Sequence, residues 1–219
     1  MSLLFNVLNI ALIAGAFLVS LGFHEAAHAF VAYRLGDPTA KIEGRLTLNP
    51  FAHIDIFGAL AIFIVNFGWG KPVPVNPAFF SNPRRDNALV ALAGPSTNLV
   101  LCTIGIFLFG ALQTFLPVLS GGALHKFLLV FITINASLAF FNLIPLPPLD
   151  GGSVLLGILP ESLVPTVSDF LGRHGVVLFF SLLAVDLFLD IHIITGPVIF
   201  LTDLFIVRVG LLFSPMFPL

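Results

Sequence analysis

The sequence predicts a mainly α-helical, polytopic membrane protein. Its 219 residues are 58% hydrophobic and only 9% charged, whereas a soluble domain carries about 25% charged residues. The mean hydropathy is +1.09, and several apolar stretches are long enough to cross roughly 30 Å of hydrocarbon. We therefore expect about five long transmembrane helices. A short re-entrant or interfacial helix and a small β element are expected between the first two of them.

Long apolar stretches mark the candidate spans. The first ends where Gly36-Asp37-Pro38 follows it, because glycine and proline terminate helices, and Pro95 predicts a kink in the second. A short helix is expected over residues 153–159, and the more polar residues 161–173 are expected to form a connector. The expected spans are residues 3 to about 35, 86 to about 115, 124–144, 176–191 and 193–213.

The segment between the first two spans is expected to contain the shorter elements. Residues 41–48 alternate between polar odd positions and apolar or glycine even positions, which favours a strand with one buried face. Residues 54–67 are apolar but too short for a standard transmembrane helix. Residues 68–77 should be extended, since each proline biases its predecessor away from the helix. Such a backbone at membrane depth must be buried in protein or line a wet cavity.

The positive charges predict the orientation. Six of the nine Lys and Arg residues lie between the first two long spans, so this region is expected in the cytoplasm and the N-terminus outside. The ends of the first and third spans would then both lie toward the cytoplasmic side. The six residues are Arg34, Lys41, Arg45, Lys71, Arg84 and Arg85.

Composition also limits the function classes and the domain organisation. A net charge of −2 provides no basic field for nucleic acid. One cysteine, Cys102, excludes an internal disulfide framework and a cysteine-rich zinc site. Without a long polar insert or an obvious repeat, we expect one membrane-embedded domain over residues 1–219. Its catalytic core would cover about 1–159 and its C-terminal helices about 160–219. The sequence does not indicate an oligomeric state.

The chemistry is expected at His24, Glu25 and His28, an H-E-x-x-H sequence at the end of the first span. Residues four apart lie on the same face of a helix, so the two imidazoles can bind one metal ion, and this spacing typically serves Zn²⁺. Glu25 lies about 100° further round the helix, where it can act as the general base of a metalloprotease. The alternative is a pair of interfacial histidines beside a solvated glutamate.

A catalytic zinc ion typically needs three protein ligands, and Asp150 is the expected third. It follows the third span on a turn shaped by prolines and glycines, although an ordinary Asp-Gly turn at the membrane surface is the alternative. Asn142 could donate a hydrogen bond to the developing oxyanion. Asn98 fits either a bond between helices or a role at the site. An extended substrate could pair with the edge of the strand expected at residues 41–48.

The sequence contains, in this order, H-E-A-A-H, A-G-P-S-T-N and N-L-I-P-L-P-P-L-D-G. Together these stretches resemble the site-2 protease family of intramembrane zinc metalloproteases. Its compact prokaryotic branch is resembled by two further stretches, G-R-L-T-L-N-P-F-A-H-I-D and G-W-G-K-P-V-P-V-N-P. The similarity covers about residues 15–155, and no family motif follows about Glu161. We expect no PDZ-like or CBS-like domain in this sequence.

The resemblance implies one zinc ion per chain, held by His24, His28 and Asp150, with Glu25 as the catalytic base. It also implies that Asn142 contacts the substrate or the oxyanion. Family members cleave membrane-embedded helices, often in anti-sigma factors or membrane-bound transcription factors, usually after a first cut elsewhere. The implied partners are a transmembrane protein substrate and the lipid bilayer of a prokaryotic cell membrane.

A non-proteolytic zinc-binding membrane protein, such as a carrier or a scaffold, is the alternative function. The intact Glu25 beside the histidine pair favours hydrolysis, because simple metal binding does not need a base. The sequence assigns no definite role to the other ionisable residues. His53 and Asp55 could orient a ligand histidine, or form a turn and helix cap. His125 is expected in an outer loop, Asp190 and His192 at an interfacial break, and Asp186 and Asp203 facing a wet cavity.

Overall fold

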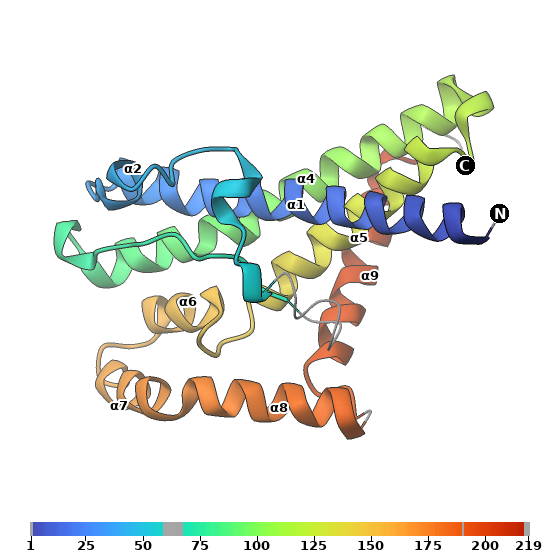
Figure 1. Ribbon diagram of the computed structural model, residues 1–219. Helices are drawn as coiled ribbons and strands as arrows, with labels where there is room; N and C mark the ends of the chain where they lie inside the picture. The colour runs from blue at the N-terminus through green and yellow to red at the C-terminus, as the bar shows by residue number, and fades with distance from the viewer. Residues whose placement is uncertain (1, 59–67, 190, 217–219) are drawn as a thin grey trace.

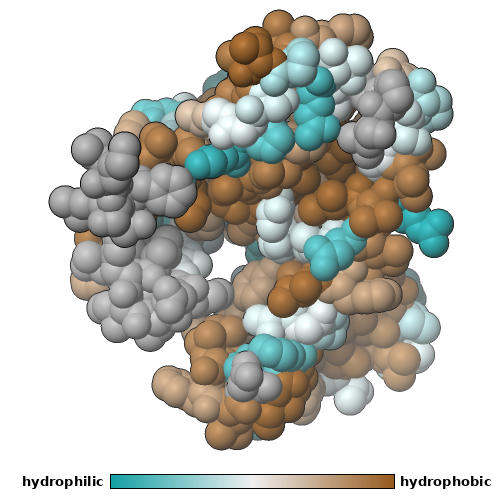
Figure 2. All heavy atoms as spheres, turned by 90° about the vertical axis from the view of Figure 1, so that its right-hand side faces the viewer, coloured by the Kyte–Doolittle hydropathy of each residue, from teal (hydrophilic) through white to brown (hydrophobic). Residues whose placement is uncertain are grey.

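The computed structural model describes residues 2–58, 68–189 and 191–216. Among them, five helices are long and apolar enough to cross a membrane, which confirms the predicted number of spans. Figure 2 shows one face of the molecule, on which hydrophobic residues are interspersed with hydrophilic ones. The five are Val7–Arg34, Pro83–Phe115, Ala123–Asn142, Val164–Leu189 and Thr195–Phe213.

Three long helices form the layer that holds the candidate site. Helix α1 (Ser2–Arg34) runs beside α4 (Pro83–Phe115), which returns in the opposite direction, and α5 (Ala123–Asn142) comes back again (Figure 1). Helix α4 continues through Pro95 as one element. Behind this layer α9 (Thr195–Phe213) packs against α4 and α5. The core there contains Cys102, Ile106, Ile132 and Ala136, with Phe205, Ile206, Val209 and Phe213 packed on it.

The region after α5 is more helical than predicted. Helix α6 (Asp150–Ile158) is followed by α7 (Val164–Phe170), a π-helical turn (Leu171–Gly175) and α8 (Val176–Leu189). The connector predicted over residues 161–173 is therefore wrong, because residues 164–189 form one continuous apolar span. Polar side chains such as Asp169 and Arg173 pair on the exposed side of this helix at 2.8 Å, so their presence did not interrupt it.

The strand predicted over residues 41–48 is wrong. Its start belongs to α2 (Thr39–Ile42), and Gly44 adopts a φ of +67°, a left-handed conformation that ends the helix and turns the chain. The alternating pattern also misidentified the buried side: Ile42 is 78% exposed, whereas Arg45 is 5% exposed. Within the described residues the β pairing consists of one antiparallel bridge, between Ile54 and Gly70.

The remaining elements between α1 and α4 are short. Two 3-10 helices, η1 (Pro50–His53) and η2 (Pro77–Phe79), flank this region, and residues 71–76 between them are extended as their prolines predict. Residues 56–58 are helical. The rest of the predicted re-entrant helix, residues 59–67, lies outside the described residues. A third short 3-10 helix, η3 (Pro117–Leu119), joins α4 to α5.

Candidate metal centre

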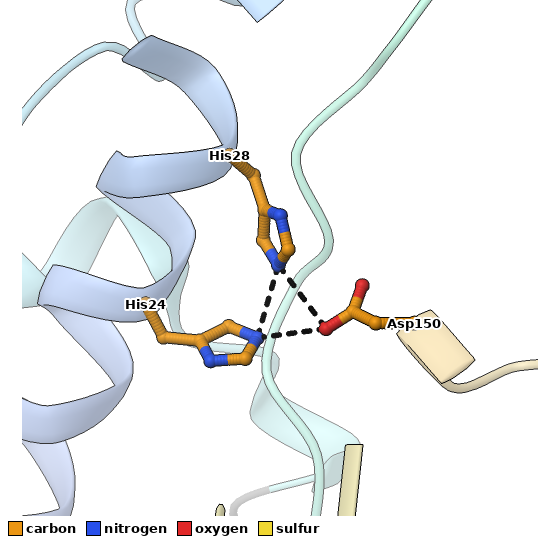
Figure 3. A group of neighbouring side chains, drawn as sticks. All are labelled: His24, His28 and Asp150. Carbon is orange, nitrogen blue, oxygen red and sulfur yellow. Dashed lines mark hydrogen bonds and ion pairs between the residues drawn. The ribbon is translucent and has the colours of Figure 1, made fainter. Parts of the chain in front are cut away.

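His24 and His28 lie one turn apart on α1 and point their imidazoles toward the start of α6 (Figure 3). Both are buried, with exposures of 4% and 7%, and their Nε2 atoms lie 3.0 Å apart. Oδ2 of Asp150 completes the group at 3.2 Å from Nε2 of His24 and 3.3 Å from Nε2 of His28. The histidine pair and Asp150, which are far apart in the sequence, therefore meet at one point.

Asp150 is the first residue of α6. The sequence places it on a turn after the third span, and the structure places it at the start of a helix. Arg84, at the start of α4, donates to the last carbonyls of α6: its Nε to Leu156 O at 2.8 Å, and its guanidinium also to Gly157 O and Leu159 O. A cation is favourable at the C-terminal end of a helix. This contact fastens one end of α6 to α4 and so holds Asp150 opposite the histidines.

Hydrogen bonds at the far side of each ring leave both Nε2 atoms directed at the centre. Nδ1 of His28 lies 2.7 Å from the carbonyl oxygen of Val90, and Nδ1 of His24 lies 2.5 Å from Oδ1 of Asn98. A carbonyl can only accept, so Nδ1 of His28 carries the proton and its Nε2 keeps a lone pair. A metal-bound histidine usually has such a partner.

The residues present fit a zinc ion. Oδ2 of Asp150 is buried and receives no hydrogen bond, so it meets the Nε2 lone pairs of His24 and His28 without a donor among them. Three electron-rich atoms at this spacing repel one another unless a cation lies between them. Tetrahedral ligands about 2.0–2.1 Å from a zinc ion lie about 3.3 Å apart, close to the three observed separations.

Gly94 on α4 keeps this space open. A Cβ atom at residue 94 would lie 2.6 Å from Nε2 of His24 and would also collide with Nε2 of His28. Glycine at this position is therefore a requirement of the centre and not of the helix, which would favour alanine. The A-G-P-S-T-N stretch thus contributes both this glycine and Asn98.

Glu25 is 8% exposed and lines the same cavity as the two histidines. Its Oε2 accepts a hydrogen bond of 3.0 Å from the backbone N–H of Val73, in the extended residues 71–76. This segment is fastened at both ends. The N–H of Lys71 donates to His53 O at 2.9 Å, and the N–H of Asn76 donates to Oδ2 of Asp37 at 2.7 Å.

A cavity of about 490 Å³ opens beside the centre. Asn142, at the end of α5, lines it, and its Nδ2 donates to Leu138 O of the same helix at 2.9 Å. Most of the other lining side chains are apolar and come from every long helix around the centre except α9. They include Phe17, Leu21, Val90, Leu138, Phe141, Phe179 and Phe180.

Other ionisable residues considered from the sequence lie away from the centre. His53 contacts Arg45 and Thr47 O, so it does not orient a ligand histidine. Oδ1 of Asp55 accepts the N–H of Gly58 at 2.8 Å, which agrees with the alternative of a helix cap. Asp190 lies outside the described residues, and Asp203 is exposed on α9.

Asp186 was predicted to face a wet cavity, and that prediction is wrong. The side chain is 4% exposed and accepts the backbone N–H groups of Ile193, Ile194 and Thr195. It therefore satisfies backbone donors at and just before the N-terminus of α9. His192, just before this turn, has a φ of 54°, in keeping with the predicted break.

Sequence reasoning missed Asn135 and Ser20, which lie behind His24. Asn98 donates to Oδ1 of Asn135 at 2.8 Å, which confirms the bond between helices, and it also contacts His24; its role at the site stays a prediction. Asn135 donates to Oγ of Ser20 at 2.8 Å. The available signal was a second asparagine within an apolar span, since polar residues there usually have a partner.

Comparison with known proteins identifies the family. Residues 117–182 match peptidase family M50. A protein of Bacillus subtilis named "Putative zinc metalloprotease YwhC" is 42% identical over 174 residues, which is 78% of this chain and 78% of that protein. The chain belongs to peptidase family M50. This membership confirms the resemblance to the site-2 proteases, the enzyme class of metalloprotease and the expected metal, Zn²⁺.

Relatives of lower sequence identity are also named as zinc metalloproteases. "Putative zinc metalloprotease Rip2" of Mycobacterium tuberculosis is 37% identical over 152 residues, 67% of this chain and 56% of that protein. The protein of the same name from Mycolicibacterium smegmatis is 35% identical over 154 residues, 66% of this chain and 56% of that protein. No solved structure matches the chain. The apolar helices and the family together make this a multi-pass membrane protein.

Proposed function

We propose that this M50 protein is an endopeptidase that hydrolyses peptide bonds within the transmembrane segments of other membrane proteins. His24, His28 and Asp150 would hold the zinc ion, and Glu25 would act as the general base. The observation that supports this best is the position of the ligand group. It lies about 9–15 Å inside the end of α1, from the rise of 1.5 Å per residue, among helices that are long enough to span a bilayer.

The bound zinc ion would polarise the scissile carbonyl and lower the pKa of a water molecule toward about 7. Glu25 takes the proton from the attacking water and later delivers it to the leaving amine. The N–H of Val73 holds one oxygen of Glu25 and so limits the orientations of the carboxylate. Asn142, at the cavity wall, is proposed to contact the substrate or the developing oxyanion.

The substrate must unwind before it can be cut, since a transmembrane helix hides its peptide bonds in its own hydrogen bonds. The strand predicted at residues 41–48 does not exist, so it cannot supply the pairing edge. Pro72, Val73 and Val75 of the extended segment line the cavity instead, and this segment is our candidate for contact with an extended substrate. The apolar lining suits a membrane-derived segment.

Glu25→Gln tests this function. The variant and the wild type are compared on a purified reporter carrying a transmembrane helix and on the same sequence made soluble by flanking polar residues. Glu25→Gln should cut neither reporter while binding zinc normally, and the wild type should prefer the membrane reporter. Glu43→Gln, an exposed acid on the loop after α2, is the matched control and should retain activity. Equal cleavage by Glu25→Gln and the wild type would remove the enzymatic assignment.

We also propose that the site faces the cytoplasmic side. The support is the cluster of Lys and Arg residues between α1 and α4 and the positive-inside rule. In a Cys102→Ala background, Lys71→Cys should react with a membrane-impermeant maleimide only after cells are opened. Val118→Cys, 87% exposed at the other end of α4, should react in spheroplasts that remain sealed. The reverse pattern would invert the orientation.

Residues 1–219 are proposed to form one membrane-embedded domain, with a catalytic core over about 1–159. The packing of α9 on α4 and α5 supports a single unit, because the C-terminal helix shares its core with two helices of the catalytic part.

A further inference from the structure

Behind His24, three polar side chains occupy the place where three membrane-spanning helices meet. Ser20 belongs to α1, Asn98 to α4 and Asn135 to α5, and each has an exposure of 0%. Polar groups buried among apolar helices are costly unless they are hydrogen-bonded. All three are connected to one another and, through Asn98, to His24.

The direction of every hydrogen bond in this group follows from two backbone carbonyls. Oγ of Ser20 lies 2.7 Å from Ala16 O, and a carbonyl only accepts, so the hydroxyl must donate there. Oγ of Ser20 is then left to accept from Asn135 Nδ2, which also donates to Phe131 O at 2.8 Å. Both protons of the Asn135 amide are used, and its Oδ1 is turned toward α4.

The same reasoning fixes the orientation of the Asn98 side-chain amide. Its Nδ2 donates to Oδ1 of Asn135 at 2.8 Å and to Ser20 O at 3.3 Å. Its Oδ1 must therefore face Nδ1 of His24, 2.5 Å away, and can only accept there. The proton of the imidazole is placed on Nδ1, which leaves the Nε2 lone pair directed at Asp150 and His28. An inverted Asn98 amide would instead present Nδ2 to the ring and favour the opposite tautomer.

We propose that Asn135 is a positioning residue for the metal centre: through Asn98 it selects the tautomer and the ring orientation of His24. This inference rests on the proposed role of His24 as a zinc ligand. Asn135 contacts neither the ion nor the histidine, and its amide offers the two donors and one acceptor that this position uses. Leucine offers none of these, and serine is too short to reach Asn98 from the same backbone.

Other polar side chains in the same helices show what a purely local role looks like. Oγ1 of Thr103 on α4 bonds back to Leu99 O at 2.8 Å, and Oγ1 of Thr133 on α5 bonds back to Leu129 O at 3.0 Å. Each satisfies its hydroxyl within its own helix. Asn135 makes one such bond, to Phe131 O, and directs its remaining bonds across to α1 and α4.

The test is a double-mutant cycle on zinc affinity, measured by competition with a chelator on the full chain in detergent. Asn98→Leu should weaken zinc binding about 10–100-fold, the usual effect of losing the partner of a ligand histidine. Asn135→Leu should weaken it by up to about tenfold. In the double variant Asn135→Leu should add nothing, because its effect passes through Asn98, whereas independent effects would add. Thr103→Val is the control and should bind zinc as the wild type does.

Two further measurements separate positioning from loss of folding. With Co²⁺ in place of zinc, the visible ligand-field bands should change in Asn135→Leu and not in Thr103→Val. Asn135→Ser keeps a hydroxyl that can bond back to Phe131 O but cannot reach Asn98, so it should show the same loss of zinc affinity even if Asn135→Leu folds poorly. Normal affinity in Asn135→Ser, or additive losses in the double variant, would overturn the proposal.

His24→Ala separates a failure of the proposed metal centre from a failure of the positioning role alone. If His24→Ala binds zinc as tightly as the wild type, the proposed metal centre itself is wrong. If His24→Ala loses zinc while the Asn135 variants keep it, the metal centre stands and only the positioning role fails.

Discussion

Glu25 and Val73 are joined by a hydrogen bond of 3.0 Å from the backbone N–H of Val73 to Oε2 of Glu25. The two residues are far apart in the sequence, and the bond links α1 to the extended segment beside the cavity. A carboxylate next to a metal site has several rotamers, and this bond favours one of them. The extended segment therefore lines the cavity and also holds the carboxylate of Glu25 in place.

Val73→Pro removes this N–H without changing Glu25. Proline is compatible with a segment that is not helical and in which Val73 already lies between Pro72 and Pro74. We expect kcat to fall roughly 10–100-fold, the scale of a misplacement of about 1 Å, with zinc content unchanged. Val73→Ala keeps the N–H and should retain most of the activity. An undiminished kcat in Val73→Pro would show that Glu25 needs no such support.

Gly94→Ala should abolish zinc binding while leaving the helix intact. The added methyl group would occupy the space in front of His24 and His28, and alanine is the better helix former by about 1 kcal/mol. Metal content after purification is the measurement. Gly15→Ala in α1, where a Cβ meets nothing within 4 Å, is the control and should bind zinc normally. Full zinc occupancy in Gly94→Ala would mean that α4 lies further from the imidazoles than described.

Arg84→Ala should destabilise the attachment of α6 to α4. Losing hydrogen bonds from a charged donor to three carbonyls should cost about 2 kcal/mol of the free energy of unfolding. Zinc affinity should fall with it, since α6 carries Asp150. The control is Arg173→Ala, which removes an exposed pair with Asp169 and should cost less than about 0.5 kcal/mol. Equal costs for the two variants would contradict the fastening role.

Asp37 should contribute stability that is lost at low pH. Burial would raise the pKa of this carboxyl, but hydrogen bonds from the side chain of Thr39 and from the N–H groups of Asn76 and Thr39 hold the pKa below its ordinary value. The folded-state pKa is thus the lower one, so the stabilisation is complete above the unfolded-state pKa of about 3.9 and disappears as the pH falls through the folded-state pKa.

The measurement for Asp37 is the difference in unfolding free energy between the wild type and Asp37→Asn, followed from pH 7 downward in zinc-free protein. The difference should favour the wild type and stay constant down to roughly pH 5, then shrink below roughly pH 4. A difference that does not change with pH would exclude the charge of Asp37 as its source.

Much of the candidate site was predictable because its signals are local. The H-E-x-x-H spacing follows from helix periodicity, and long apolar runs define the spans, so His24, Glu25, His28 and the number of spans were all predicted. Predicting Asp150 required the added assumption that the first and third spans end at the same depth. The short distances from Asp150 to His24 and His28 agree with that assumption. None of this needed knowledge of side-chain contacts.

The errors arose where contacts between distant segments override local patterns. The alternation over residues 41–48 resembles a strand, but Arg45 is turned inward by its bonds to Lys71 O and His53. Asp186 was misread because its partners, the first N–H groups of α9, follow a break in the chain. The partners of Asn98 on α1 and α5 were unpredictable because the sequence does not state which helices pack together.

The proposed metal centre takes its ligands from α1 and α6 and its supporting residues from α4 and α5, which has a consequence for biogenesis. A nascent chain that has inserted only its first two spans can offer two imidazoles but neither the amide of Asn135 nor the carboxylate of Asp150. Because metal binding is coupled to folding when the ligands come from distant segments, zinc capture should be a late event. The enzyme would remain catalytically silent until synthesis has passed α6 and the spans have assembled.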